Sequence, residues 1–168
     1  EFIILIYHYK TLKCQVSEML AKASQLAEDE RYTQALKYYE RILQIESDNI
    51  GVIIDYGVTL QNLGQYNLAL AMYDKALTIQ PKNMNALLNK GSVLHALEKY
   101  SEAIFYYNII LNTDKNNPIA LVYKGLCIAE IGNINLAIKY FKKALSIDAE
   151  YELAEISINT AKYIMKSR

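Results

Sequence analysis

The chain has 168 residues, of which 52% are hydrophobic and 21% are charged, fractions that are typical of a folded globular protein. Its 18 Lys and Arg residues balance its 18 Asp and Glu residues, so no net charge favours binding to nucleic acid or to an anionic membrane. Cys14 and Cys127 lie far apart in the sequence, and their spacing suggests neither a metal site nor a set of disulfides. We expect no metal and no cofactor, and we expect a reducing, cytoplasmic location.

Residues 1–15 begin with an apolar run, Phe2 to Tyr7. The run is about a third as long as a membrane span, and no small-residue cleavage pattern follows it, so we expect neither a transmembrane helix nor a signal peptide. The apolar start and the missing initial Met suggest a piece of a longer protein. For this N-terminal apolar extension we expect an added helix that packs on another molecule.

Residues 16–151 repeat with a period of 34. Apolar residues within each period recur at spacings of three and four, which predicts helices and not strands. We therefore expect four units of two helices each, at 16–49, 50–83, 84–117 and 118–151. Three sets of residues keep the period: the glycines Gly57, Gly91 and Gly125; the alanines Ala35, Ala69, Ala103 and Ala137; and the aromatic residues Tyr39, Tyr73, Tyr107 and Phe141.

Polar residues mark the predicted helix boundaries. Asn49, Asn83 and Asn117 precede the first helices of their units, where a side-chain oxygen accepts from the free N–H groups of the opening turn. Good capping residues also stand near the start of every second helix, and we expect them to be the N-caps: Thr33, Asn67, Ser101 and Asn135.

The turns inside the units differ from one another. Gly64 and Gly132 stand where a left-handed residue commonly ends the first helix, whereas Glu30 and Glu98 hold that place in the other two units. We expect the two glutamates to be strained or their turns to be built differently. The helical glycines predict a close approach of the paired helices, with Gly57, for example, facing the small residue Ala69.

Residues 152–168 carry apolar residues at helical spacing together with exposed charges. Asn159 stands where the repeat has Gly, so we expect a capping helix with a polar outer face and not a fifth repeat.

A two-helix unit of 34 residues with this pattern resembles the tetratricopeptide repeat. The second unit matches best, through Gly57, Gly64, Tyr66, Ala69, Tyr73, Ala76 and Pro81. The resemblance implies an all-α, right-handed α-solenoid of helical hairpins whose first helices line a concave groove. The family's frequent Trp is replaced by Met19, Ile53, Leu87 and Leu121.

The resemblance also implies which residues face the groove. On this basis the candidate peptide- or partner-binding residues are Leu20, Ser24, Ile54, Asp55, Val58, Asn62, Leu88, Asn89, Ser92, His95, Val122, Tyr123, Leu126 and Glu130. Family members that bind acidic chaperone tails present Lys, Asn and Arg at fixed groove positions. Those positions here lack positive charge, and Asp55 and Glu130 would repel a carboxylate. We expect a neutral, apolar or mildly basic peptide.

Catalytic chemistry has little support in the sequence. His8 and His95 are the only histidines and neither has a catalytic motif around it, while Cys127 fits a small buried apolar residue. We therefore expect a non-catalytic protein–protein interaction module. The alternative is a self-assembly domain, with homodimers formed through the ends of the array or through residues 1–15.

Overall fold

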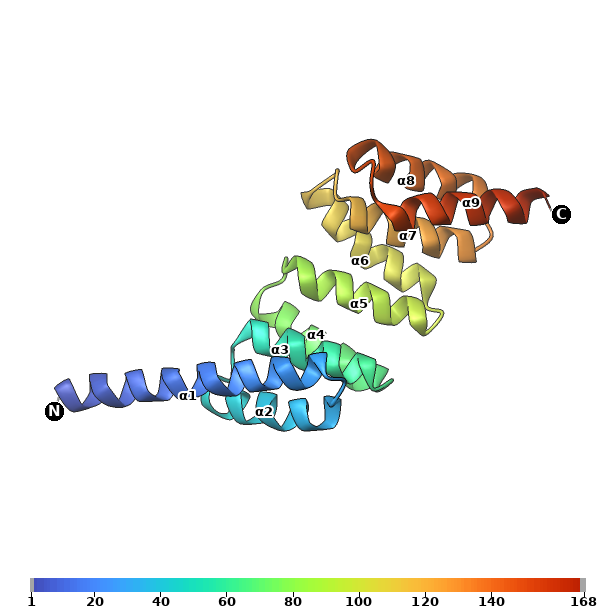
Figure 1. Cartoon of the computed structure of the whole chain (residues 1–168). Coiled ribbons are helices and arrows are strands. Elements are labelled where there is room, and N and C mark those ends of the chain that lie inside the picture. The colour runs from blue at the N-terminus through green and yellow to red at the C-terminus, as the bar shows by residue number, and fades with distance from the viewer. Residues whose placement is uncertain (1, 167–168) are drawn as a thin grey trace. The chain divides into compact units, whose positions relative to one another are not determined.

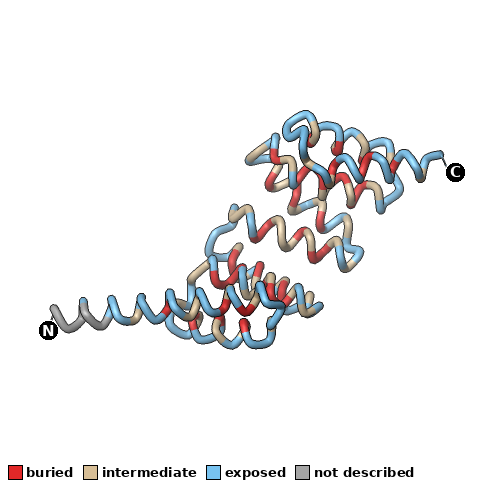
Figure 2. The backbone as a smooth tube through the Cα atoms, viewed as in Figure 1, coloured by how far each residue is buried: buried red, intermediate tan, exposed pale blue. Residues whose placement is uncertain are grey.

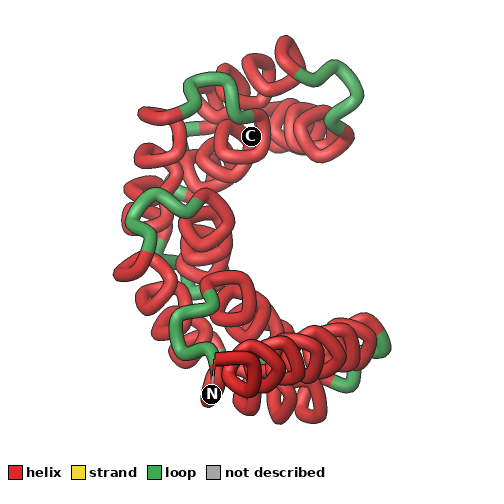
Figure 3. The backbone as a smooth tube through the Cα atoms, turned by 90° about the vertical axis from the view of Figure 1, so that its left-hand side faces the viewer, coloured by secondary structure: helices red, strands yellow, loops and turns green. Residues whose placement is uncertain are grey.

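The computed structural model describes the backbone of residues 2–166 and the side chains of residues 6 and 9–166. Within this part of the chain every regular element is a helix, and short loops join the helices in order (Figure 3). The prediction of an all-α helical-repeat protein is therefore confirmed. The chain divides into two compact units, Glu1–Pro81 and Lys82–Arg168 (Figure 1).

Unit 1 contains α1 (Phe2–Glu28), α2 (Tyr32–Ile45), α3 (Ile50–Asn62) and α4 (Tyr66–Ile79). Consecutive helices pack on one another, and the buried residues lie on the faces where they meet (Figure 2). Its core cluster consists of Val16, Ala23, Leu26, Ala35, Tyr39, Ile42 and Val52.

Helix α1 is continuous across residues 15 and 16, where we expected an added helix to meet the first repeat. Thr11 to Gln15 include no Gly or Pro that would end a helix, so the extension becomes the N-terminal part of α1. In Figure 1, α1 runs on past the end of α2.

Unit 2 contains α5 (Met84–Ala96), α6 (Tyr100–Thr113), α7 (Pro118–Glu130), α8 (Ile134–Ile147) and α9 (Glu152–Lys166). Helix α9 packs on both α7 and α8. Its apolar side is part of the core cluster, which consists of Leu121, Val122, Ile128, Ala137, Phe141, Ala144, Ala154 and Ile158.

The three predicted asparagine caps are confirmed. The Oδ1 atom of Asn49 accepts from the backbone N–H of Val52 at 3.2 Å, and Asn83 accepts from that of Ala86 at 3.0 Å. Asn117 accepts in the same way from Ala120 at 2.9 Å. Each bond satisfies one free donor of an opening helical turn.

The four predicted caps of the second helices are wrong. Thr33, Asn67, Ser101 and Asn135 lie inside their helices, because α2, α4, α6 and α8 start one residue earlier. The cause is the tight closing turn: the N–H groups of Arg31, Gln65, Lys99 and Asn133 bond back five residues, to Leu26, Leu60, Leu94 and Ile128. These four residues are themselves the N-caps, and of them only Asn133 caps with its side chain.

The closing turns place one residue in the left-handed region in each hairpin. Gly64 has φ 72° and Gly132 has φ 96°, and Glu30 and Glu98 adopt φ 58° and 60° in the equivalent turns. The glutamates are therefore strained, as expected, because a Cβ atom in this conformation crowds the following carbonyl oxygen.

The helical glycines face aromatic rings and not the alanines that we expected. A Cβ atom added at Gly57 would lie 2.6 Å from Cε1 of Tyr73, and one at Gly91 would lie 2.6 Å from Cε1 of Tyr107. At Gly125 the added atom would lie 2.5 Å from Cε1 of Phe141. The glycines are thus required by the large rings that fill the hairpins.

Among the described residues, no helix combines the length and the apolar character that a membrane crossing requires.

Candidate interaction surface

The predicted groove residues of unit 1 lie on two helices, α1 and α3. Tyr39 of α2 links these helices, because its hydroxyl is within hydrogen-bonding reach of Ser24 on α1 and of Thr59 on α3. Ile54 is 8% exposed and offers little surface to a partner. The remaining predicted residues of this unit are at least partly accessible: Leu20, Ser24, Asp55, Val58 and Asn62.

Asp55 is the acidic residue of this surface. Desolvation by its surroundings raises the pKa of the Asp55 carboxyl. Burial raises the pKa of the Tyr39 and Tyr73 hydroxyls, and the nearby Asp55 charge raises both further. No cation of the described residues pairs with Asp55, so this carboxylate is available to a basic group from outside.

The predicted groove residues of unit 2 lie on α5 and α7. Val122 is wholly buried at 0% exposure, so this predicted residue presents no surface to a partner. It packs in the core because α5, α6 and α9 all meet α7. The others are at least partly accessible: Leu88, Asn89, Ser92, His95, Tyr123, Leu126 and Glu130.

Tyr123 is held in place by an aromatic contact. Its ring stacks on Tyr107, with centroids 5.9 Å apart and an interplanar angle of 23°. Because Tyr107 is itself wholly buried, the stack packs one face of the Tyr123 ring against the core while Tyr123 stays partly accessible.

An apolar pocket lies where α7 and α8 meet α9, with a volume of about 280 Å³. Leu126 and Glu130 belong to the predicted set, and Glu130 is the only charged side chain in the lining. The other lining residues are Ala129, Ile134, Phe141, Leu153, Ile156, Ser157, Thr160, Ala161 and Ile164. A pocket of this size and character suits one or two aliphatic side chains of a peptide.

The contribution of α9 to this pocket was missed in the sequence. We treated residues 152–168 only as a cap, although the 34-residue period continues through them. Ile156 and Thr160 stand one period after Val122 and Leu126, so the period itself would have placed them on the same surface.

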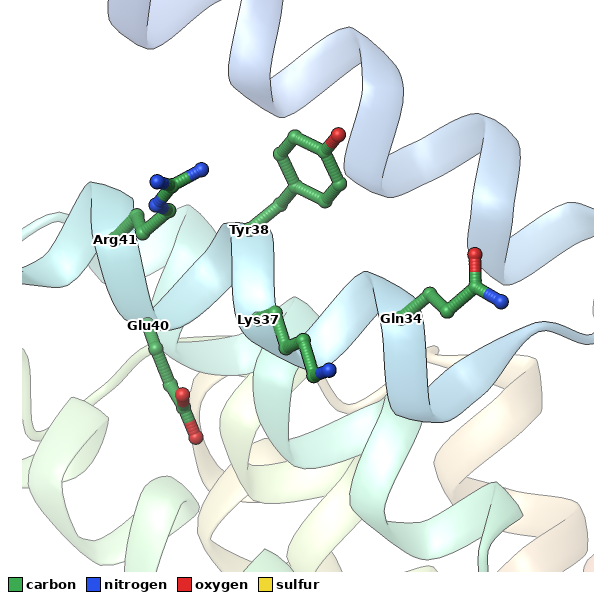
Figure 4. A pocket seen from close by; sticks show the side chains of 5 residues that line it. All are labelled: Gln34, Lys37, Tyr38, Glu40 and Arg41. Atoms are coloured by element: carbon green, nitrogen blue, oxygen red, sulfur yellow. The ribbon is translucent and has the colours of Figure 1, made fainter.

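A second hollow, of about 560 Å³, lies over α2 (Figure 4). Its five lining residues, Gln34, Lys37, Tyr38, Glu40 and Arg41, all come from this one helix. Glu40 already accepts a hydrogen bond from the Tyr56 hydroxyl at 2.9 Å. A hollow walled by a single helix with charged side chains is open to water and lacks the converging walls of a binding site.

Two of the residues considered for catalysis, Cys127 and His95, lie on helices of unit 2. Burial raises the pKa of the Cys127 thiol to about 12, so the thiol is protonated at neutral pH and is a poor nucleophile. The His95 ring packs edge-on against Tyr100, with centroids 5.3 Å apart. The His8 side chain lies outside the described residues. In the described part of the chain, no three His, Cys, Asp or Glu residues form a group that could hold a metal.

Family models match two parts of the sequence. Residues 28–107 match the model described as anaphase-promoting complex, cyclosome, subunit 3, and residues 124–151 match a tetratricopeptide repeat model. No curated protein matches the sequence.

Solved structures share the fold at low identity. MamA from Desulfovibrio magneticus RS-1, residues 41 to the end, is 20% identical with a TM-score of 0.74, over 90% of this chain and 92% of that one. YrrB, a tetratricopeptide repeat protein with an unusual peptide-binding site, is 21% identical with a TM-score of 0.69. The match covers 94% of this chain and 84% of YrrB. A thermophilic tetratricopeptide repeat protein from Thermus thermophilus is 19% identical with a TM-score of 0.76. The match covers 89% of this chain and 82% of that protein.

The helical hairpins, the glycine–aromatic contacts and the matches to both family models agree with one another. The chain belongs to the tetratricopeptide repeat family.

Proposed function

We propose that the chain is a non-catalytic protein-interaction module that binds a segment of a partner protein on exposed faces of the first helices of its repeats. The observation that carries this proposal is the apolar pocket between α7, α8 and α9, with Glu130 in its lining. The pocket has the composition expected for an anchoring site, with apolar walls and one orienting charge. Asn89, Ser92 and Tyr123 would contact the partner's backbone beside it.

The partner segment that fits this surface combines an aliphatic residue with a nearby Lys or Arg. Asp55 and Glu130 are the charged members of the predicted set, and the set contains no Lys or Arg. Glu130 would repel an acidic segment at the pocket, whereas it would attract a basic one. Cys14 and Cys127 are unpaired, which favours a reducing, cytoplasmic location.

A display library of random peptides would test the proposal, with binding of the selected peptides measured by isothermal titration calorimetry. Ile156 is 52% exposed, so Ile156→Asp should leave the fold intact and weaken binding about tenfold by placing a charge against an apolar side chain. Leu68→Asp is the matched control, because Leu68 on α4 is 55% exposed and does not line the pocket.

Replacing Asn89 and Tyr123 together by Ala should also reduce binding while the circular dichroism spectrum stays unchanged. Glu130→Gln should remove the preference for basic peptides. If the selected peptides bind the Ile156→Asp and wild-type proteins equally well, this surface is not the binding site.

A further inference from the structure

The N-terminal part of α1 extends past the end of α2 (Figure 1). Helix α1 has 27 residues and α2 has 14, so α1 is about 40 Å long and its neighbour about 21 Å. The core of unit 1 involves α1 only from Val16 onwards. A helix end of this length is marginal in water by itself, so it gains from a packing partner.

The exposed face of this helix end is partly apolar and partly basic. Ile6 is 42% exposed and Tyr9 is 59% exposed, and Lys10 and Lys13 are exposed beside them. Their spacing of three, four and seven residues from Ile6 puts all four on one side of the helix. The ammonium group of Lys13 lies 5.4 Å from the centre of the Tyr9 ring.

The pocket of unit 2 is complementary to that face. Its walls are apolar, its single charged side chain is the acidic Glu130, and Ile156 beside it is half exposed. The chain therefore carries a helix end with an exposed apolar and basic face in one unit and an apolar, acidic pocket in the other. The formal net charge is zero, so two copies do not repel each other.

We propose that the N-terminal part of α1 of one copy binds the pocket between α7, α8 and α9 of a second copy. Ile6 and Tyr9 enter the apolar pocket, and Lys10 or Lys13 pairs with Glu130. This inference rests on the proposed function, since it assigns a partner to the same pocket. A single helix in a pocket buries less area than a standard interface, so association is weak and requires micromolar or higher concentration.

The two contacting surfaces are different, so the interface is heterologous. In a dimer one copy keeps a free pocket and the other keeps a free helix end, so association continues beyond the dimer unless a ring closes. Pairing of two α1 helices with each other would instead be symmetric and would stop at the dimer.

A charge swap tests the pairing, measured by size exclusion with light scattering over a wide concentration range. The wild-type mass should rise with concentration past that of two copies. Glu130→Lys, or Lys10→Glu with Lys13→Glu, should each weaken association about tenfold, since a close charge pair becomes repulsive. Combining all three substitutions should restore it. Lys22→Glu is the control, because Lys22 is exposed on the same helix but lies within the packed part of α1.

Two outcomes would overturn the inference. One is a wild-type monomer at every concentration, and the other is a dimer that Glu130→Lys does not weaken. If selected peptides bind the pocket while the chain stays monomeric, the proposed function stands and only self-association is rejected. A version beginning at Gln15 provides a second check, because it should stay monomeric and still bind peptides.

Discussion

Two hairpins, α3–α4 of unit 1 and α5–α6 of unit 2, each bury a tyrosine at the same position of the repeat. The two tyrosines differ in whether the hydroxyl group is hydrogen-bonded. In unit 1 the Tyr73 hydroxyl donates to Oε1 of Gln61 at 3.1 Å. In unit 2 the Tyr107 hydroxyl has no hydrogen-bond partner among the described residues. Nε2 of His95, which stands where unit 1 has Gln61, also lacks one there. The repeat pattern thus places an aromatic ring in both hairpins. Whether the tyrosine hydroxyl has a hydrogen-bond partner depends on a second position, which holds Gln61 in unit 1 and His95 in unit 2.

We expect the largest change in stability from the feature that the two hairpins share, an aromatic ring packed on a helical glycine. Gly91→Leu should lower the free energy of unfolding by about 1–3 kcal/mol, because the new side chain overlaps the Tyr107 ring. Thermal denaturation measures the change. Gly51→Ala is the control, since its added Cβ meets only Oδ1 of Asn49, at 3.5 Å. An unchanged melting temperature for Gly91→Leu would refute the packing account.

The next effect concerns the hydroxyl groups that distinguish the hairpins. Tyr73→Phe should destabilise the protein by about 1 kcal/mol, because it removes a hydrogen bond. Tyr107→Phe should stabilise it by about the same amount, because it removes a buried group that has no protein partner. Phe141 holds this place in the α7–α8 hairpin, so Phe is tolerated there. Urea denaturation gives both values, and a loss of stability in Tyr107→Phe would show that its hydroxyl is satisfied.

The smallest effect concerns the closing turns, where each unit has one glutamate and one glycine. A left-handed non-glycine residue costs about 1–2 kcal/mol, and glycine loses about 0.5–1 kcal/mol more chain entropy on folding. Glu30→Gly and Glu98→Gly should therefore each stabilise the protein by about 0.5–1 kcal/mol. Gly64→Ala is the reciprocal variant and should destabilise it. If Glu98→Gly lowers the melting temperature, the glutamate side chain stabilises the folded state by more than the backbone strain destabilises it.

Much of the fold could be predicted because the periodic residues act locally. Asn49, Asn83 and Asn117 were placed correctly, since a cap depends on a residue and on the helix that follows it directly. The caps of the second helices were misplaced because a backbone hydrogen bond of the closing turn determines where each of these helices starts. The sequence gives no sign of that hydrogen bond. The period alone also could not show that Gly91 faces a ring and not an alanine.

The candidate surface was harder to predict than the fold. Which side chains of one helix stay accessible depends on the neighbouring helices, so Val122 and Ile54 were assigned to a surface where the structure buries them. The α9 side of the pocket was missed because Asn159 interrupts the glycine pattern, although the neighbouring positions keep the apolar period.

Among the described residues of each unit, the main helix contacts join helices one or two steps apart along the chain. A whole hairpin can therefore be gained or lost without separating residues that must meet across a long stretch of sequence. An insertion of one complete period would leave every asparagine at the start of its helix and every ring over its glycine. An insertion of another length within a hairpin would break both relations, so we expect relatives of this protein to differ in length by whole repeats.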